Sequence, residues 1–221
     1  MSELNHDTLI AKTARYVKVQ LDGEGSGHDW WHIERVWKMS NRLAAGETAN
    51  ETVVGLAALL HDIADHKFHN GDETVGPKVA RNWLEGIQTE ESIIAHVCEI
   101  IKNLSYKGAG VDTPMQTLEG KIVQDADRLD AIGAIGIARA FAYGGHKNRE
   151  LYNPTKPPVL HASFEAYKND TGSTLNHFYE KLFLLKDRLN TQSAKIIAEQ
   201  RHQYMETFVQ RFLQEWDGTD S

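Results

Sequence analysis

Hydrophobic residues recur along most of the chain at intervals of three and four, which places them on one face of an α-helix. Between Val53 and Ala64 apolar residues occupy nearly every side, which indicates a central buried helix. The predicted helices run, in chain order, through residues 9–17, 33–43, 53–64, 75–84, 91–104, 117–141, 175–188 and 191–216. No alternating pattern of the length that a β-strand needs is present, so the sequence predicts an all-α protein.

One polar stretch interrupts the helical pattern. Residues 143–173 contain three of the 5 prolines of the chain, and we expect this stretch to form a loop excursion. No internal repeat divides the rest of the sequence. We therefore expect a single domain over residues 1–221, with its motif-bearing core at 28–141 and C-terminal helices within 175–216.

Composition narrows the class of protein. Of the 221 residues, 41% are hydrophobic and 25% are charged, which is ordinary for a globular protein. The net charge is -7, so the chain lacks the surplus of Lys and Arg that binding to a nucleic-acid polymer requires. DNA and RNA are therefore not expected partners. Cys98 is the single cysteine, which excludes a disulfide within the chain and a Cys-rich zinc site. Its apolar neighbours favour a buried position.

The sequence also bears on location. The first residues, MSELNHDTLIAK, lack the basic start and apolar stretch of a secretory leader. No run approaches the ~20 apolar residues that a membrane-spanning helix needs. We therefore expect a cytoplasmic protein without a membrane partner.

Polar clusters interrupt the apolar pattern in several places. The most apolar stretch ends in LLHDIADHKF, where His61 and Asp62 stand side by side. In GSGHDWWHIERVW, His28 and His32 are four residues apart, and in QDADRLD two carboxylates are three apart, so each pair shares a helix face. Imidazole nitrogens and carboxylate oxygens together suit a borderline divalent ion such as Mn²⁺, Fe²⁺, Co²⁺, Ni²⁺ or Zn²⁺. Burying these groups is otherwise costly, so the clusters predict a metal site.

The order of these motifs resembles the HD-domain phosphohydrolase superfamily, whose signature is H…HD…D on a helical bundle. Four sequence segments are similar to those of one bacterial HD hydrolase subfamily that includes nucleotide pyrophosphohydrolases. These segments are HDWWHIERVW, LLHDIADHKF, IIKNLSYKG and IVQDADRLDAIGAIGIAR. The resemblance runs from about His28 through Arg139, and FYEKLFLLKDRLNT at residues 178–191 resembles the subfamily too. It implies an all-α HD-domain bundle and a metal-dependent phosphohydrolase.

The resemblance also implies roles for individual residues. It matches His32, His61, Asp62 and Asp127 to the four metal ligands. Asp127 is assigned as the last ligand because the segment ADRL matches the superfamily's motif at that position. It implies a catalytic role for Asp65, which helps to orient or deprotonate the attacking water in related enzymes. The implied cofactor is one divalent metal, with Mn²⁺ favoured and Co²⁺, Ni²⁺, Fe²⁺, Zn²⁺ or Mg²⁺ as alternatives.

Further cations and histidines are candidates for binding a substrate phosphate. An ammonium or guanidinium group suits this role, although an ordinary surface ion pair would also account for it. An imidazole can contact phosphate or water, or it can be structural. The candidate substrate-binding residues are Lys67, His96, Lys107, His28 and Arg35.

These observations favour a metal-dependent phosphohydrolase acting on a small phosphorylated substrate, expected to be a nucleotide. The reaction would be either nucleoside triphosphate pyrophosphohydrolysis or phosphomonoester cleavage. Two alternatives remain open, a non-catalytic metal- and nucleotide-binding regulatory module and a di-iron HD-type oxygenase. The sequence leaves the substrate base, the number of metals and the oligomeric state undecided.

Overall fold

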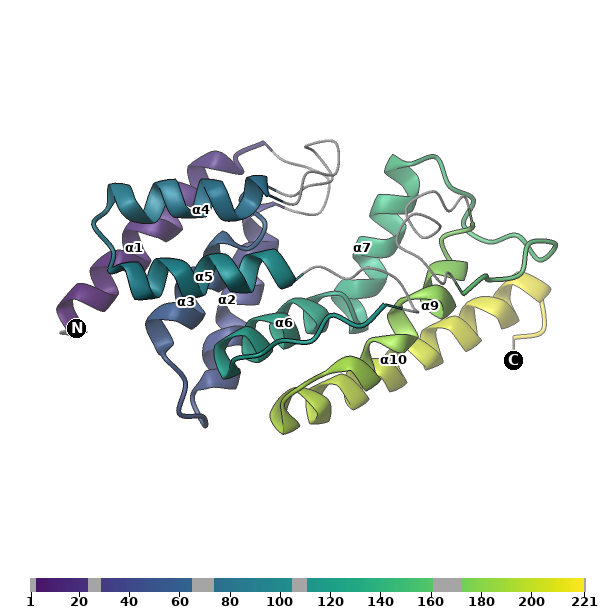
Figure 1. Ribbon diagram of the computed structural model, residues 1–221. Helices are drawn as coiled ribbons and strands as arrows, with labels where there is room; N and C mark the ends of the chain where they lie inside the picture. Colours follow the sequence, from purple (N-terminus) through teal and green to yellow (C-terminus); the bar gives the residue numbers. More distant parts are fainter. Residues whose placement is uncertain (1–2, 24–28, 65–73, 105–110, 161–171, 221) are drawn as a thin grey trace. The chain divides into compact units, whose positions relative to one another are not determined.

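The regular structure of the chain is helical throughout the part described here. The computed structural model describes residues 1–221 except 1–2, 24–28, 65–73, 105–110, 161–171 and 221 (Figure 1). Within the described residues every regular element is an α-helix or a 3₁₀ helix, and no strand occurs. The predicted all-α class is therefore confirmed.

The helices fall into two compact units along the sequence. The first unit comprises Met1–Tyr106 and Thr113–Ala126, and the second comprises Lys107–Asp112 and Asp127–Ser221. The boundary between the two units lies within one continuous helix, α6 (Leu118–Asp130), which therefore contributes residues to both. The single-domain organisation expected from the sequence stays a prediction.

Among the residues that the structure describes, five further helices form the first unit, and α3 lies at its centre. They are α1 (Glu3–Gln20), α2 (Trp30–Ala44), α3 (Glu51–Leu60), α4 (Val75–Gly86) and α5 (Glu91–Asn103). Every residue of α3 after Glu51 is buried, and the helix packs against α1, α2 and α5. Each fully buried leucine contributes about 1.5–3 kcal/mol relative to an exposed one, so α3 is held firmly by its apolar neighbours.

Local contacts fix where α3 begins and how closely α1 approaches it. The side chain of Asn50 caps α3 by accepting hydrogen bonds from the backbone N–H groups of Thr52 and Val53. A Cβ at Gly55 would lie 2.6 Å from Cδ1 of Ile10, so the absence of a side chain there lets α1 pack directly on α3. Both features follow from the sequence, because Asn is a preferred N-cap and Gly permits close packing.

The predicted helix over residues 117–141 is wrong at one point, because two helices occupy this range. Helix α6 ends at Asp130, and α7 (Gly133–His146) begins three residues later. Gly133 has φ of +76°, which breaks the helical path and which a residue with a Cβ rarely adopts. The apolar periodicity of AIGAIG continues through the break, so the spacing of apolar residues alone does not predict it.

The second unit continues with α9 (Asn176–Glu180), the 3₁₀ helices η2 (Leu182–Leu184) and η3 (Lys186–Arg188), and α10 (Gln192–Asp217). The predicted helix over 175–188 is therefore replaced by three short pieces, since the backbone of Lys181 (φ −140°, ψ −58°) leaves the helical region after α9. The predicted last helix is present, and Thr191 caps it by accepting a hydrogen bond from the N–H of Ala194.

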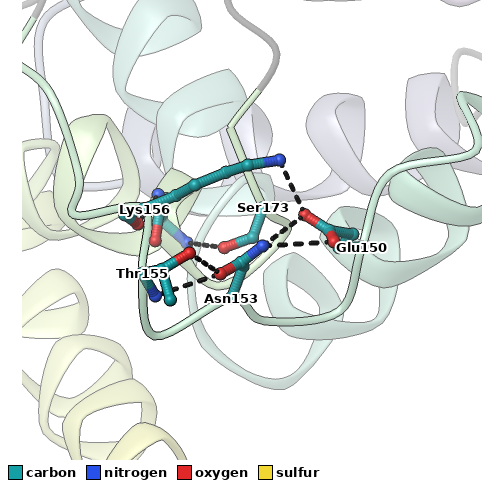
Figure 2. Close-up of polar contacts among 6 residues, drawn as sticks. Glu150, Asn153, Thr155, Lys156 and Ser173 are labelled. Carbon is teal, nitrogen blue, oxygen red and sulfur yellow. Dashed lines mark hydrogen bonds and ion pairs between the residues drawn. The ribbon is translucent and has the colours of Figure 1, made fainter.

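The segment that follows α7 is tied to the rest of its unit. Residues 143–146 belong to α7 rather than to the predicted excursion. The carboxylate of Glu150 accepts hydrogen bonds from Asn153 and Lys156, which lowers the pKa of that carboxyl group (Figure 2). The amide of Asn176 donates to the carbonyl of Lys156 at 2.9 Å, and the N–H of Thr174 donates to the carbonyl of Glu150. The described part of the excursion is thus an anchored loop.

Candidate metal centre

His32 lies in the first turn of α2, and the start of that helix fixes its backbone. Asp29 is the N-cap of α2, and its Oδ1 accepts a hydrogen bond from the N–H of His32 at 2.9 Å. The side chain of His32 is fully buried. Of the two His-Asp dipeptides in the sequence, the one at Asp29 therefore serves the helix cap, whereas the one at His61 and Asp62 lies among the site residues.

His61 follows the last residue of α3 and points its ring into the same buried region. Its Nδ1 lies 2.8 Å from the carbonyl oxygen of Ala58, which can only accept a hydrogen bond. The proton of the neutral imidazole is therefore on Nδ1, and the lone pair is on Nε2. A hydrogen bond of this kind is the usual way in which a protein orients a histidine that ligates a metal.

The two imidazoles meet through their Nε2 atoms, which are 3.2 Å apart. At a metal–nitrogen distance of ~2.1 Å, two ligand nitrogens lie ~3.0 Å apart for a right angle and ~3.4 Å apart for a tetrahedral angle. The observed separation lies between these values. Oδ2 of Asp62 is 3.4 Å from Nε2 of His32 and 3.6 Å from Nε2 of His61, so a carboxylate adjoins both nitrogens.

Asp127 completes the cluster from α6. His32, His61 and Asp127 each offer one ligand atom, and these atoms all lie within 4.8 Å of one another. Nitrogen and oxygen donors at this spacing, with one imidazole already fixed in the tautomer that a ligand needs, could hold a divalent transition ion. The donor set therefore fits the metal that the sequence predicted, and it includes three of the four expected ligands with Asp62 beside them.

Several expected site residues have no described position. Asp65, Lys67, Lys107 and His28 lie outside the described residues, so their predicted roles stay predictions. Arg35 is half-buried on α2, one helical turn after His32.

His96 belongs to α5, and its polar contacts are with residues at the start of α6 rather than with the three ligands. Its Nε2 is 2.9 Å from Oγ1 of Thr117 and 3.8 Å from a carboxylate oxygen of Glu119. At the helical rise of ~1.5 Å per residue, Thr117 lies about 15 Å along α6 from Asp127. A role for His96 in binding substrate requires a ligand that spans this distance.

Some residues near the site were not singled out as site residues from the sequence. Asp29 could have been found, because an Asp directly before an apolar-periodic segment is a helix-start signal. Arg139 and Arg201 donate to the last turn of α6, Arg139 to Oδ2 of Asp130 at 2.7 Å and Arg201 to the carbonyl of Leu129. No helical spacing rule links either arginine to α6, so spacing along the sequence does not predict these contacts.

Comparisons with known proteins identify the family to which the chain belongs. The sequence profile of the HD domain matches residues 30–132, which contain all four expected ligands. The Bacillus subtilis protein YpgQ is 37% identical over 212 residues, which is 93% of this chain and 93% of its own. A crystal structure of YpgQ in complex with ADP has 33% identity and a TM-score of 0.74, over 96% of this chain and 100% of that chain.

A second solved structure comes from Bacillus thuringiensis and is described as an HD-superfamily hydrolase. It is 47% identical, has a TM-score of 0.75, and covers 96% of this chain and 98% of its own. The chain therefore belongs to the HD superfamily of metal-dependent phosphohydrolases. Within the described part of the chain, no helix has the length and apolar character that crossing a membrane requires.

Proposed function

We propose that the protein hydrolyses a phosphate bond of a nucleotide, with one divalent transition metal held by His32, His61, Asp62 and Asp127. The observation that carries this proposal is the pair of buried imidazoles whose Nε2 atoms lie 3.2 Å apart beside carboxylates. Without an ion, two buried imidazoles and two half-buried carboxylates would be costly to bring together. Mn²⁺ is the favoured ion, because mixed nitrogen and oxygen donors suit it.

The residues of the chain have distinct parts in this proposal. A divalent ion in such a site lowers the pKa of a bound water and polarises the phosphate that it contacts. The hydrogen bond from His61 to the carbonyl of Ala58 holds that ring in one orientation. Asp65, three residues after Asp62, would orient the attacking water and accept its proton. Lys67, Lys107 and Arg35 would neutralise the substrate phosphates.

A nucleotide is proposed as substrate because a related protein of known structure binds one. YpgQ, which resembles this chain over nearly its full length, has been crystallised with ADP. Cleavage between the α and β phosphates of a nucleoside triphosphate would release pyrophosphate, whereas phosphomonoester cleavage would release inorganic phosphate. The cytoplasmic location expected from the sequence remains a prediction that cell fractionation would test.

The first experiment measures metal binding and turnover in the same samples. We expect Asp62→Asn to lower the affinity for Mn²⁺, measured by isothermal titration calorimetry, and to reduce hydrolysis by at least about 100-fold, because a ligand is lost. Asp187→Asn is the matched control, since Asp187 is an exposed carboxylate of η3. Equal affinity and turnover in wild type and Asp62→Asn would contradict the proposed site.

A second experiment separates the possible reactions. The wild-type protein is incubated with dATP or dAMP and Mn²⁺, Co²⁺, Ni²⁺ or Mg²⁺, and the products are separated by anion exchange. Release of dAMP and pyrophosphate from dATP supports pyrophosphohydrolysis, and release of deoxyadenosine from dAMP supports phosphomonoester cleavage. Tight nucleotide binding without product would indicate a regulatory module, and two irons per chain with oxygen consumption would indicate an oxygenase.

A further inference from the structure

The last turn of α6, which carries Asp127, is held by side chains from two other helices of the second unit. A helix end leaves backbone carbonyls without intrahelical partners, and unsatisfied ends fray. At this end Arg201 of α10 donates a hydrogen bond to the carbonyl of Leu129. Arg139 of α7 donates to Oδ2 of Asp130 at 2.7 Å. We call Arg139 and Arg201 the arginine clasp.

The contact between Arg139 and Asp130 is an ion pair in a largely buried setting. Asp130 is only 5% exposed, so its carboxylate needs a partner to offset the loss of water. Charge-assisted hydrogen bonds of this length are among the stronger ones in proteins. The pair therefore fixes the end of α6 against α7.

The contact of Arg201 depends on the turn that separates α6 from α7. A Cβ at Gly133 would lie 3.0 Å from Cγ and 3.1 Å from Cβ of Arg201. The aliphatic part of Arg201 thus passes directly over Gly133, and its guanidinium group reaches the carbonyl of Leu129. Cations at a helix C-terminus are favourable because the last carbonyls carry partial negative charge.

The arginine clasp lies outside the part of the chain that the HD-domain profile matches. That match ends at residue 132, whereas the clasp residues are at positions 139 and 201. A metal ligand must be held to within ~0.5 Å, and Asp127 lies in the last turn of α6, which fraying of the helix end would displace. A support for this turn is therefore supplied by α7 and α10, outside the range that the HD-domain profile matches.

We propose that Arg139 and Arg201 are positioning residues that hold Asp127 in place for metal binding. This inference rests on the proposed function, because it requires a metal at His32, His61 and Asp127. Loss of either arginine would leave Asp127 chemically intact but would loosen the turn that carries it. The affinity for the metal would then fall without the loss of any ligand atom.

The test measures the dissociation constant for Mn²⁺ by isothermal titration calorimetry and the unfolding temperature without metal. Arg201→Met keeps an aliphatic stem but loses the donor, and we expect its dissociation constant to rise about tenfold. Arg201→Lys keeps both stem and donor, and we expect it to stay within about threefold of wild type. Arg211→Met is the matched control on α10, because Arg211 pairs with the exposed Glu215.

Equal dissociation constants for Arg201→Met and Arg201→Lys would overturn the inference, because packing alone would then explain the contact. If Arg201→Met does not fold, Arg139→Gln decides, and an unchanged dissociation constant in that variant overturns the inference. The proposed function fails separately, if wild type binds no Mn²⁺ or if Asp127→Asn binds it as tightly as wild type. In that case the inference falls with it.

Discussion

At the scale of single residues, His61 combines a structural and a chemical position. It directly follows the last residue of a helix that is buried on nearly every side, and its Nδ1 bonds back to the carbonyl of Ala58. The rigid helix therefore sets the backbone of His61, and the hydrogen bond sets its ring. A ligand placed in this way requires little reorganisation when an ion binds.

Ser40 provides a test of buried polar groups in the helix that also carries His32. Its side chain is fully buried on α2, and its hydroxyl has no hydrogen-bond partner within the described structure. Ser40→Ala removes the unsatisfied hydroxyl and adds a better helix former, so the free energy of unfolding should rise by about 1 kcal/mol. Urea denaturation measures this, with Ser193→Ala on the exposed face of α10 as control. A less stable Ser40→Ala protein would mean that the hydroxyl is satisfied.

At this scale the resemblance to the HD superfamily named a ligand set whose members lie far apart along the chain. His32, His61 and Asp127 lie close enough together to hold a metal ion, and the role of each as a ligand stays a prediction. Cys98 is only half-buried rather than enclosed, and its Sγ donates to the carbonyl of Pro77, while burial raises the pKa of its thiol. The position of His96 could not be predicted, because it depends on which end of α6 packs near α5.

At the scale of elements, the junction between α6 and α7 is the point at which the single helix predicted over residues 117–141 divides into two. A Cβ at Gly136 would lie 2.2 Å from the carbonyl oxygen of Ala131, so α7 starts against the backbone that precedes it. The helical periodicity predicted most helix positions, because it depends only on which face is buried. The junction depends on backbone sterics, which apolar spacing does not encode.

Gly136→Ala tests this junction. We expect the free energy of unfolding to fall by at least about 2 kcal/mol, because the new Cβ meets backbone that cannot move independently. Gly145→Ala is the matched control on the same helix, since nothing lies within 4 Å of a Cβ at that position. The control should be neutral or slightly more stable, as Ala is the better helix former. Chemical denaturation compares both variants, and equal effects would contradict the steric explanation.

At the scale of the whole molecule, His177 links stability to pH. Burial, with the positive charges of Lys181 and Arg149, lowers the pKa of its imidazole from 6.5 to about 3. The unfolded chain therefore binds a proton below pH 6.5 that the folded protein does not bind until about pH 3. Folding stability falls as the pH decreases through this window, by up to about 1.4 kcal/mol per pH unit from this group.

The variant His177→Gln should show a shallower loss of stability between about pH 6 and about pH 4, because it cannot take up the proton. Urea denaturation at several pH values measures the slope, and other groups cancel when variants are compared. His146→Gln, at an exposed histidine of α7, should keep the slope of wild type. Identical slopes for all three proteins would contradict a lowered pKa at His177.

Helix α6 has a consequence for hybrid proteins made by exchanging parts of related genes. The boundary between the two compact units falls between Ala126 and Asp127, inside an unbroken run of helical hydrogen bonds. A genetic crossover at this point would join half-helices that had never been selected to continue one another. Hybrid proteins made from related genes should therefore be more stable when the point of exchange lies outside this helix.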